Sequence, residues 1–330
     1  MTIVPDKALP IHVMSQEIAE HVDVSLAAVA ARDAATARAL GAVETRRVTL
    51  PYEGGWMRLM AASVASLDVF GYKEFHLAAK TDVRYTIHLF ALADGRPLGI
   101  VDAALITTLR TAAAAALAAE SFFGSGQSVR LGVVGTGAEA LAGVRALAAA
   151  LKLEHVRVTS RSETNRAKFV AALADQLGLR AEAAATAGDC SAGADLVFTA
   201  TNSGGAVVVR PEEVDGVPFV ASIGSTLPVQ RELDGRVLAE ARHVVVDTPD
   251  VLKESGDAIA AAQCGLDPGK VSLLGQMPSR AWGVAAGQTV YKSIGSPEQD
   301  IVLAHAVLEA ARRSDFGRPM QPLSAIKVNM

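Results

Sequence analysis

The chain has 330 residues, of which 50% are hydrophobic, 20% charged and 5% aromatic, and its formal net charge is −4 at pH 7. The length suits two domains, the composition is typical of a globular protein, and the slight negative charge argues against a nucleic acid or an anionic membrane as partner. No apolar run approaches the about 20 residues that span a bilayer, and the N-terminus lacks a secretory signal, so we expect a cytoplasmic location.

The first part of the chain, residues 1–123, mixes helix-like and strand-like segments and carries no nucleotide fingerprint. A helix is predicted over 25–40 with Ser25 as its N-cap, and a second, alanine-rich helix is predicted over 106–120. The run that contains Lys73 has β character. Strands are predicted over 46–50, 57–61, 85–92 and 97–101.

A Gly/Ser cluster at 124–127 marks the expected domain boundary, because it supplies turn chemistry and little else. Beyond it, apolar strands alternate with helices, which is typical of a parallel sheet covered by helices. The predicted fold is therefore α/β, with a Rossmann-type doubly wound parallel sheet in residues 124–299. A tail helix over 300–313 is expected to return to the first domain, so that this α+β domain (1–123 and 300–330) is discontinuous. The predicted strands of the sheet are 131–134, 156–159, 196–199, 219–223 and 244–247.

The most specific motif is Gly135-Thr136-Gly137-Ala138-Glu139-Ala140, which follows an apolar strand and opens a helix-forming segment. Gly135 permits a tight turn, Gly137 lets the backbone approach a pyrophosphate, and Ala140 lets the helix pack closely on the strand. The helix N-terminus offers N–H groups and the positive end of its dipole to the anion. A tight turn of an ordinary α/β protein is the alternative, but strand, turn and helix all agree with a dinucleotide site.

The end of the next strand bears on the choice of cofactor. NAD sites usually place an acid about 20 residues beyond the glycines, whereas this chain has Ser160-Arg161-Ser162 there and Arg166 further on. An arginine attracts a 2′-phosphate and can hydrogen-bond it as a fork. NADP(H) is therefore predicted as the cofactor, and NAD(H) is the alternative if Arg161 is only a solvated surface residue.

Two later strands end in polar loops, Thr199-Ala200-Thr201 and Ile223-Gly224-Ser225-Thr226. The carboxyl ends of strands face the ligand crevice in open α/β sheets, so these hydroxyls could line it. Loops with self-bonded hydroxyls are the alternative.

Other polar residues give weaker signals. Arg110 is expected to open the alanine-rich helix, where a cation opposes the helix dipole, which indicates either a bound anion or solvent exposure. Lys73 taken alone is expected to be a surface lysine. Cys190 and Cys264 are expected to be free thiols, and the scattered histidines predict no metal site.

These pieces, taken in order, resemble the ornithine cyclodeaminase/μ-crystallin superfamily over nearly the whole chain. The resembling elements are Arg47 with strand 57–61, Gly71-Tyr72-Lys73, 106–113, 134–140, 199–201, 231–234, 253–257, 291–295 and Asp300.

The resemblance implies a nicotinamide-dependent enzyme that acts at the α-carbon of an amino or imino acid. In the family the first domain binds substrate and forms a homodimer, and the second is the Rossmann domain. Carried over, Arg47, Lys73 and Arg110 would hold the substrate carboxylate, with Thr86 alongside, and Lys73 would pass a proton to the imine nitrogen. Lys292 and Gly295 would join the residues of the three loops above in binding the cofactor.

One position departs from the family pattern. Ornithine cyclodeaminases place an acid after the Ile-Gly-x of the catalytic loop, where this chain has Thr226. Threonine carries no charge and cannot act as a general base near neutral pH, and ketimine reductases of μ-crystallin type also lack the acid.

The predicted function is therefore imine (ketimine) reduction or amino-acid dehydrogenation on a small 2-imino or 2-amino acid such as pyrroline- or piperideine-2-carboxylate. Ornithine cyclodeaminase, which makes proline and ammonia, is the runner-up. A non-catalytic NADP(H)-binding protein of μ-crystallin type is the alternative from another class.

Overall fold

The computed structural model describes residues 9–78, 82–279 and 287–321, which form two compact units. Unit 1 extends to Thr107 and resumes at Pro297, and unit 2 is Thr108–Ser296. The segment from Pro297 onward thus belongs to the same compact unit as the N-terminal part. The chain leaves unit 1 inside helix α3 (Ala104–Phe123), not at the expected boundary. The Gly124–Gln127 cluster instead forms the turn from α3 into the next strand, because alanine lets the helix continue across the division.

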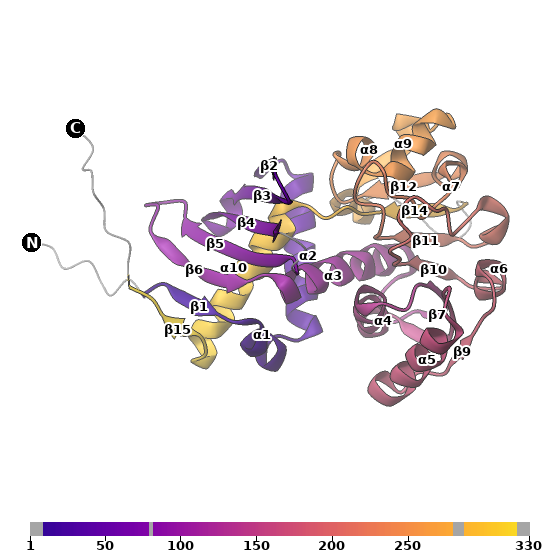
Figure 1. The fold of residues 1–330 in the computed structure, drawn as a ribbon, viewed down its shortest axis with the longest axis horizontal. Coiled ribbons are helices and arrows are strands. Elements are labelled where there is room, and N and C mark those ends of the chain that lie inside the picture. Colours follow the sequence, from indigo (N-terminus) through magenta and orange to yellow (C-terminus); the bar gives the residue numbers. More distant parts are fainter. Residues whose placement is uncertain (1–8, 79–81, 280–286, 322–330) are drawn as a thin grey trace, which may run out of the picture. The chain divides into compact units, whose positions relative to one another are not determined.

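Unit 1 is built on a seven-stranded sheet with the order β15-β1-β6-β5-β4-β3-β2 (Figure 1). The strands from β2 to β6 form an antiparallel meander, and β1 runs parallel to β6. Each of the strands predicted in residues 1–123 lies in this sheet. The strands are β1 (Ile11–Val13), β2 (Val43–Tyr52), β3 (Gly55–Val64), β4 (Val69–Ala78), β5 (Arg84–Ala91), β6 (Pro97–Asp102) and β15 (Arg318–Pro319).

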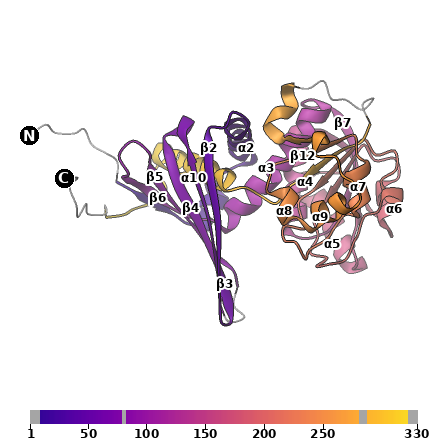
Figure 2. The ribbon, with the colours of Figure 1, turned by 90° about the horizontal axis from the view of Figure 1, so that it is seen from above.

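The helices of unit 1 are α1 (Ser15–His21), α2 (Val24–Ala39), α10 (Pro297–Ser314) and the 3-10 turn η1 (Ala65–Leu67). Helix α10 packs across the sheet and α2 packs on α10 (Figure 2). The predicted N-cap of α2 was wrong by two residues. Asp23 caps the helix by accepting the Leu26 N–H at 3.0 Å, and the Ser25 hydroxyl donates to the same carboxylate at 2.7 Å. These hydrogen bonds, that from Ser25 first, lower the pKa of Asp23.

Unit 2 contains an eight-stranded parallel sheet with the order β13-β12-β14-β11-β10-β7-β8-β9. The predicted strands all lie in it, and β9, β13 and β14 were not predicted. The order reverses at β7, which places a topological switch point between β7 and β10. The strands are β7 (Ser128–Val134), β8 (Lys152–Thr159), β9 (Ala181–Ala183), β10 (Leu196–Thr199), β11 (Phe219–Ser222), β12 (His243–Val246), β13 (Val271–Leu273) and β14 (Thr289–Lys292).

Small residues let the helices of unit 2 approach this sheet closely. A Cβ on Gly143 of α4 would lie 2.3 Å from the Phe198 ring of β10, so only glycine permits this contact. Apolar strand residues such as Val197, Val220 and Val244 form the buried core. The doubly wound α/β fold predicted for this part is confirmed. Its helices are α4 (Ala138–Ala150), α5 (Glu163–Leu177), α6 (Ala187–Ser191), α7 (Gly235–Glu240), α8 (Val251–Glu254), α9 (Gly256–Gln263), η2 (Pro211–Glu213), η3 (Pro268–Lys270) and η4 (Leu274–Ser279).

Candidate cofactor and substrate sites

A cavity of about 470 Å³ opens at the carboxyl ends of β7, β8 and β10. This is the switch point of the sheet, where open α/β sheets bind their ligands. The sequence prediction missed part of its lining, including Asn165, Thr186 and Ser203. Thr186 carried a signal, since a threonine three residues before Asp189 is a plausible helix cap, and it does cap α6. The loops that line most of the cavity are 134–137, 159–162, 185–187 and 200–203.

The glycine-rich turn after β7 has the geometry that a pyrophosphate needs. Gly135 has φ +123°, and a Cβ there would lie 2.2 Å from the Ala200 carbonyl oxygen. Gly137 is the N-cap of α4, makes no side-chain cap hydrogen bond, and has no atom within 4 Å of where its Cβ would stand. The first N–H groups of α4 therefore face space that an anion can enter. Ala140, in the first turn of α4, is fully buried.

Glu139 stands next to this turn but has a partner within the protein. The Thr108 hydroxyl of α3 donates to its carboxylate at 2.6 Å. Neither Glu139 nor Ala138 lines the cavity, so the structure does not bring these two predicted residues to it.

The loop after β8 brings Ser160, Arg161 and Ser162 to the cavity wall. Ser162 also caps α5, because its hydroxyl oxygen accepts the Asn165 N–H at 3.2 Å. Arg166 lies behind this loop and donates from Nη1 to the Ser160 carbonyl at 2.5 Å. An arginine thus lines the cavity where an acid would bind a ribose, and a second arginine holds the loop.

A buried carboxylate that sequence reasoning missed connects the ends of β10 and β11. Glu232 has no exposed surface. It accepts the hydroxyls of Thr199 at 3.1 Å, Thr201 at 2.7 Å and Ser222 at 2.9 Å. It also accepts the backbone N–H groups of Thr201 and of Gly224, the latter at 2.8 Å. Thr199 is therefore fully buried against Glu232, whereas Thr201 and Ala200 reach the cavity.

Lys292, at the end of β14, is also fully buried and does not line the cavity, so the structure does not support its predicted cofactor contact. Its ammonium donates to the Ser222 hydroxyl at 3.1 Å and to the Gly224 carbonyl oxygen. It lies 3.7 Å from Asp257 Oδ2. Burial raises the pKa of Asp257, although Lys292 opposes this.

The loop 223–226 lies against this network. Ser225 has φ +54° and donates its hydroxyl to the Gln230 carbonyl at 2.7 Å. Thr226 donates its N–H at 2.9 Å and its hydroxyl at 3.3 Å to the Gln230 side chain. Ile223, Gly224 and Ser225 do not line the cavity, and their cofactor contact stays a prediction.

In unit 1, the strand register aligns Arg47, Met60 and Lys73 across one face of the sheet. Lys73 is 1% exposed, so it is not the surface lysine that the residue alone suggested. Its ammonium lies 2.6 Å from Asp300 Oδ2 at the start of α10 and donates to the Thr107 hydroxyl of α3 at 3.4 Å. Arg47 is half-buried, so a guanidinium and the buried ammonium of Lys73 share this face.

Thr86 does not join this face. It pairs in register with Glu74, the residue after Lys73, and successive residues of a strand point to opposite sides. Its hydroxyl donates to Glu74 Oε2 at 3.3 Å. The predicted place of Thr86 beside the substrate carboxylate is therefore corrected.

Arg110 is buried and lies beyond the first turn of α3, because the helix begins at Ala104 and not near Arg110. The dipole at the helix N-terminus therefore gives no reason to expect an anion beside Arg110. Asp102 is the sequence signal for the start of this helix, because its carboxylate accepts the Ala104 N–H at 3.2 Å. A Cβ on Gly295, which has φ +76°, would lie 2.2 Å from an Arg110 guanidinium nitrogen. The absence of a side chain at Gly295 thus leaves room for the Arg110 guanidinium. The sequence predicted a cofactor contact for Gly295 and not this packing.

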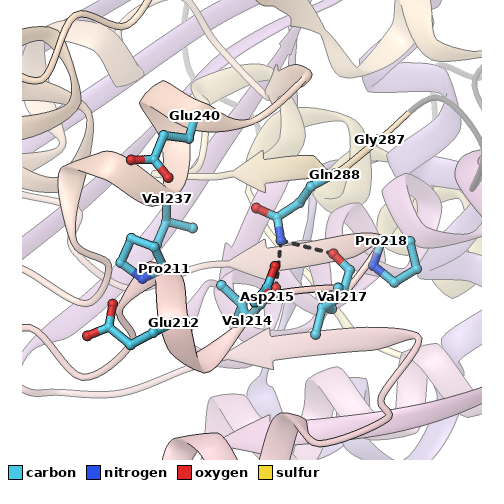
Figure 3. Close-up of a pocket in the computed structure, with 11 residues that line it drawn as sticks. Pro211, Glu212, Val214, Asp215, Val217, Pro218, Val237, Glu240, Gly287 and Gln288 are labelled. Carbon is cyan, nitrogen blue, oxygen red and sulfur yellow. Dashed lines mark hydrogen bonds between the residues drawn. The ribbon is translucent and has the colours of Figure 1, made fainter.

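A second cavity, of about 650 Å³, lies at the opposite edge of the unit 2 sheet, near the amino ends of β11 and β14. Figure 3 shows the Gln288 amide turned toward the backbone, donating to the Val214 and Val217 carbonyls at 3.0 and 2.9 Å. The carboxylates that line it lie on the surface: Glu212, Asp215 and Glu240. Its one amide is occupied, so this cavity offers little chemistry compared with the cavity at the carboxyl edge.

Within residues 9–78, 82–279 and 287–321, no helix is both long and apolar enough to cross a bilayer, and no cluster has the composition of a metal site. Cys190 and Cys264 are free, as predicted. Burial raises the pKa of the Cys190 thiol to about 12, which makes it inert, whereas Cys264 is exposed.

A doubly wound parallel sheet with a glycine-lined cavity at its switch point defines the class of Rossmann-type dinucleotide-binding proteins. The model of the ornithine cyclodeaminase/mu-crystallin family matches residues 11–315, and the chain belongs to this family. Two relatives are each 25% identical to it. A Delta(1)-pyrroline-2-carboxylate reductase of Bacillus cereus aligns over 90% of this chain and 94% of its own. The ketimine reductase mu-crystallin of Mus musculus aligns over 92% and 98%.

Solved structures agree with this membership. A probable ornithine cyclodeaminase of Bordetella pertussis Tohama I is 30% identical, with a TM-score of 0.82 over 94% of this chain and 100% of that one. The iminosuccinate reductase of Paracoccus denitrificans with NAD+ is 25% identical, with a TM-score of 0.85 over 96% and 100%. An archaeal alanine dehydrogenase dimer with bound NAD is 25% identical, with a TM-score of 0.84 over 95% and 99%.

Proposed function

We propose that the chain is an NAD(P)H-dependent imine reductase or amino-acid dehydrogenase that acts on a small 2-imino or 2-amino acid. The observation that carries the proposal is the buried Lys73–Asp300 pair, in register with Arg47 on one face of the unit 1 sheet. In a family whose relatives reduce pyrroline-2-carboxylate and ketimines, such a cationic face suits the α-carboxylate of the substrate. Pyrroline- and piperideine-2-carboxylate are the leading substrates.

Each of the proposed site residues has its own role in the reaction. Arg47 and Arg110 bind the substrate carboxylate and orient the α-carbon, since a guanidinium binds a carboxylate through two parallel hydrogen bonds. Lys73, held by Asp300, supplies the proton that the imine nitrogen gains during reduction. The bound nicotinamide supplies the hydride that the α-carbon receives. Thr226 provides no carboxylate, which favours simple reduction over the ammonia-releasing chemistry of a cyclodeaminase.

We further propose that the cavity of unit 2 holds the dinucleotide, with the pyrophosphate at Gly135–Gly137 and the adenosine ribose near Arg161. The fit rests on the open space in front of Gly137 and on the uncapped start of α4. Structural neighbours bind NAD, and Arg161 in the cavity wall favours NADP(H) here. Replacing Arg161 by Ala is expected to weaken NADPH binding about tenfold and to leave NADH binding unchanged. Equal effects on both would refute the role of Arg161.

A homodimer through unit 1 is the proposed assembly. Strand β2 lies at the edge of the sheet, and Val48, Leu50 and Tyr52 are exposed on the face opposite Arg47. Such an apolar edge is typical of an interface, and the archaeal alanine dehydrogenase is a dimer. Light scattering coupled to gel filtration tests this assembly, and a monomer would contradict it.

The activity test measures NADPH and NADH oxidation with cyclic and acyclic 2-imino acids, beside an assay for proline and ammonia from ornithine. Imine-dependent oxidation of the cofactor is expected, with no formation of proline from ornithine. Proline from ornithine would establish the cyclodeaminase instead. Cofactor binding without either reaction would indicate a binding protein.

A further inference from the structure

The Glu232 carboxylate is the common acceptor for two loops that do not follow one another in sequence. It accepts the Thr201 N–H and hydroxyl from the loop after β10, and the Gly224 N–H from the loop after β11. Because Thr201 lines the cofactor cavity, the position of this part of the cavity wall depends on Glu232. The Ala200 carbonyl before it also meets the glycine-rich turn at Gly135.

Lys292 also contacts the loop after β11. Its ammonium donates to the Gly224 carbonyl oxygen, while Glu232 accepts the Gly224 N–H, so both polar groups of this glycine are held. A Cβ on Gly224 would lie 2.3 Å from Glu232 Cδ, which shows how closely the carboxylate packs on the loop.

The network contains two buried carboxylates, those of Glu232 and Asp257, and one buried ammonium, that of Lys292. The half-buried Arg231 adds a second cation, because its Nε donates to Asp257 Oδ1 at 3.3 Å. Lys292 donates to the Ser222 hydroxyl at 3.1 Å, and that hydroxyl donates to Glu232 at 2.9 Å. Asp257 accepts the Glu232 N–H at 2.9 Å and lies 3.7 Å from the Lys292 ammonium. Burying a charge costs free energy unless such partners are present. Apolar residues would therefore join the two loops at a lower cost in free energy if the contact were purely structural.

We propose that Glu232 is a positioning residue for the bound dinucleotide and that Lys292, which is linked to it through the Ser222 hydroxyl, supports it in this role. Neither side chain reaches the cavity. Glu232 acts through Thr201, whose backbone and side chain it holds at the cavity wall, and Lys292 acts through Ser222 and Gly224. The proposal rests on the proposed cofactor site in unit 2, and it adds a second set of residues to the glycine-rich turn.

The test is a fluorescence titration of NADPH and NADH on purified protein, which needs no imine substrate. Glu232→Gln keeps the size of the side chain but turns an amide NH₂ toward groups that are themselves donors. It is expected to raise the Kd of both cofactors at least about tenfold. Glu240→Gln makes the same change on an exposed carboxylate of α7 and is expected to bind like the wild type. Unfolding curves of each variant are recorded in parallel.

Two milder variants keep the test decisive if Glu232→Gln fails to fold. Thr201→Val removes one donor to Glu232 and is expected to raise the Kd of both cofactors several-fold, roughly as one lost hydrogen bond would. Thr201→Ser keeps the hydroxyl and is expected to bind both cofactors like the wild type. A folded Glu232→Gln with unchanged Kd, or a Thr201→Val indistinguishable from Thr201→Ser, would overturn the proposal. Absence of cofactor binding by the wild type would instead refute the proposed cofactor site.

Discussion

Lys73 in unit 1 and Lys292 in unit 2 are both buried and both lie near an aspartate, yet their other partners differ. Lys73 stands in the middle of antiparallel strand β4, on a sheet face that it shares with Arg47. Lys292 ends a parallel strand and donates to the backbone of the neighbouring loop. A cation on a sheet face can meet a ligand directly, whereas Lys292 can act on the cavity wall only through the Ser222 hydroxyl and Glu232, which accepts from Thr201.

Replacing Lys73 is expected to have the largest effect. Lys73→Met leaves the buried Asp300 without its ammonium, which costs about 3–5 kcal/mol of folding stability. Loss of the proton donor is expected to lower kcat about 10²–10⁴-fold, with cofactor binding unchanged. Stopped-flow turnover and a nucleotide titration on the same sample measure both. A folded Lys73→Met that turns over normally would remove the distinction between the two lysines.

Arg110→Ala is expected to reduce kcat/KM next most strongly. The loss of a buried charged contact to the substrate carboxylate corresponds to about 2–4 kcal/mol of transition-state stabilisation. Steady-state kinetics with the preferred imino acid measures it, and Arg32→Ala, on the exposed surface of α2, is a matched control. If kcat/KM hardly changed, Arg110 would not bind the carboxylate.

Lys292→Met sharpens the comparison from the other side. It is expected to weaken NADPH binding about tenfold, because the Ser222 hydroxyl that donates to Glu232 loses its ammonium donor and Glu232 holds Thr201 at the cavity wall. The KM for the imino acid is expected to stay near its wild-type value. Cofactor titration and substrate saturation curves separate these constants. A change confined to the KM of the imino acid would place Lys292 with the substrate, as Lys73 is.

Thr86→Val is expected to have the smallest effect. The substitution removes the hydrogen bond to Glu74 on the far face of the sheet, a loss of about 1 kcal/mol of stability. Kinetic constants are expected to remain unchanged, because Thr86 does not share the face of Lys73. Urea unfolding and a kcat/KM determination suffice. A fall in kcat/KM beyond about threefold would place Thr86 at the substrate site after all.

The same contrast explains what the sequence could predict. The turn at Gly135–Ala140 is a local pattern of strand, glycine and helix, so its conformation and its place at the cavity follow from neighbouring residues. The face that Thr86 presents depends on strand register, which a sequence alone does not give. The resemblance led to Lys73, but its partner Asp300 lies on a helix far along the chain.

Glu232 and Arg110 show two other limits. Glu232 gathers donors from Thr199, Thr201, Ser222 and Gly224, and only the folded sheet brings these strand ends together. Arg110 was assigned to the start of a helix because the alanine run hides where the helix begins. Asp102 marks that start, and an aspartate before a helical run is a signal that could have been used.

The most direct test of the proposed function is the oxidation of NADPH by the wild-type protein with pyrroline-2-carboxylate or piperideine-2-carboxylate. The proposed function predicts imine-dependent consumption of NADPH with formation of the cyclic amino acid, and no proline from ornithine. Formation of proline and ammonia from ornithine, without reduction of either imine, would contradict it and would show that Thr226 does not prevent cyclodeamination.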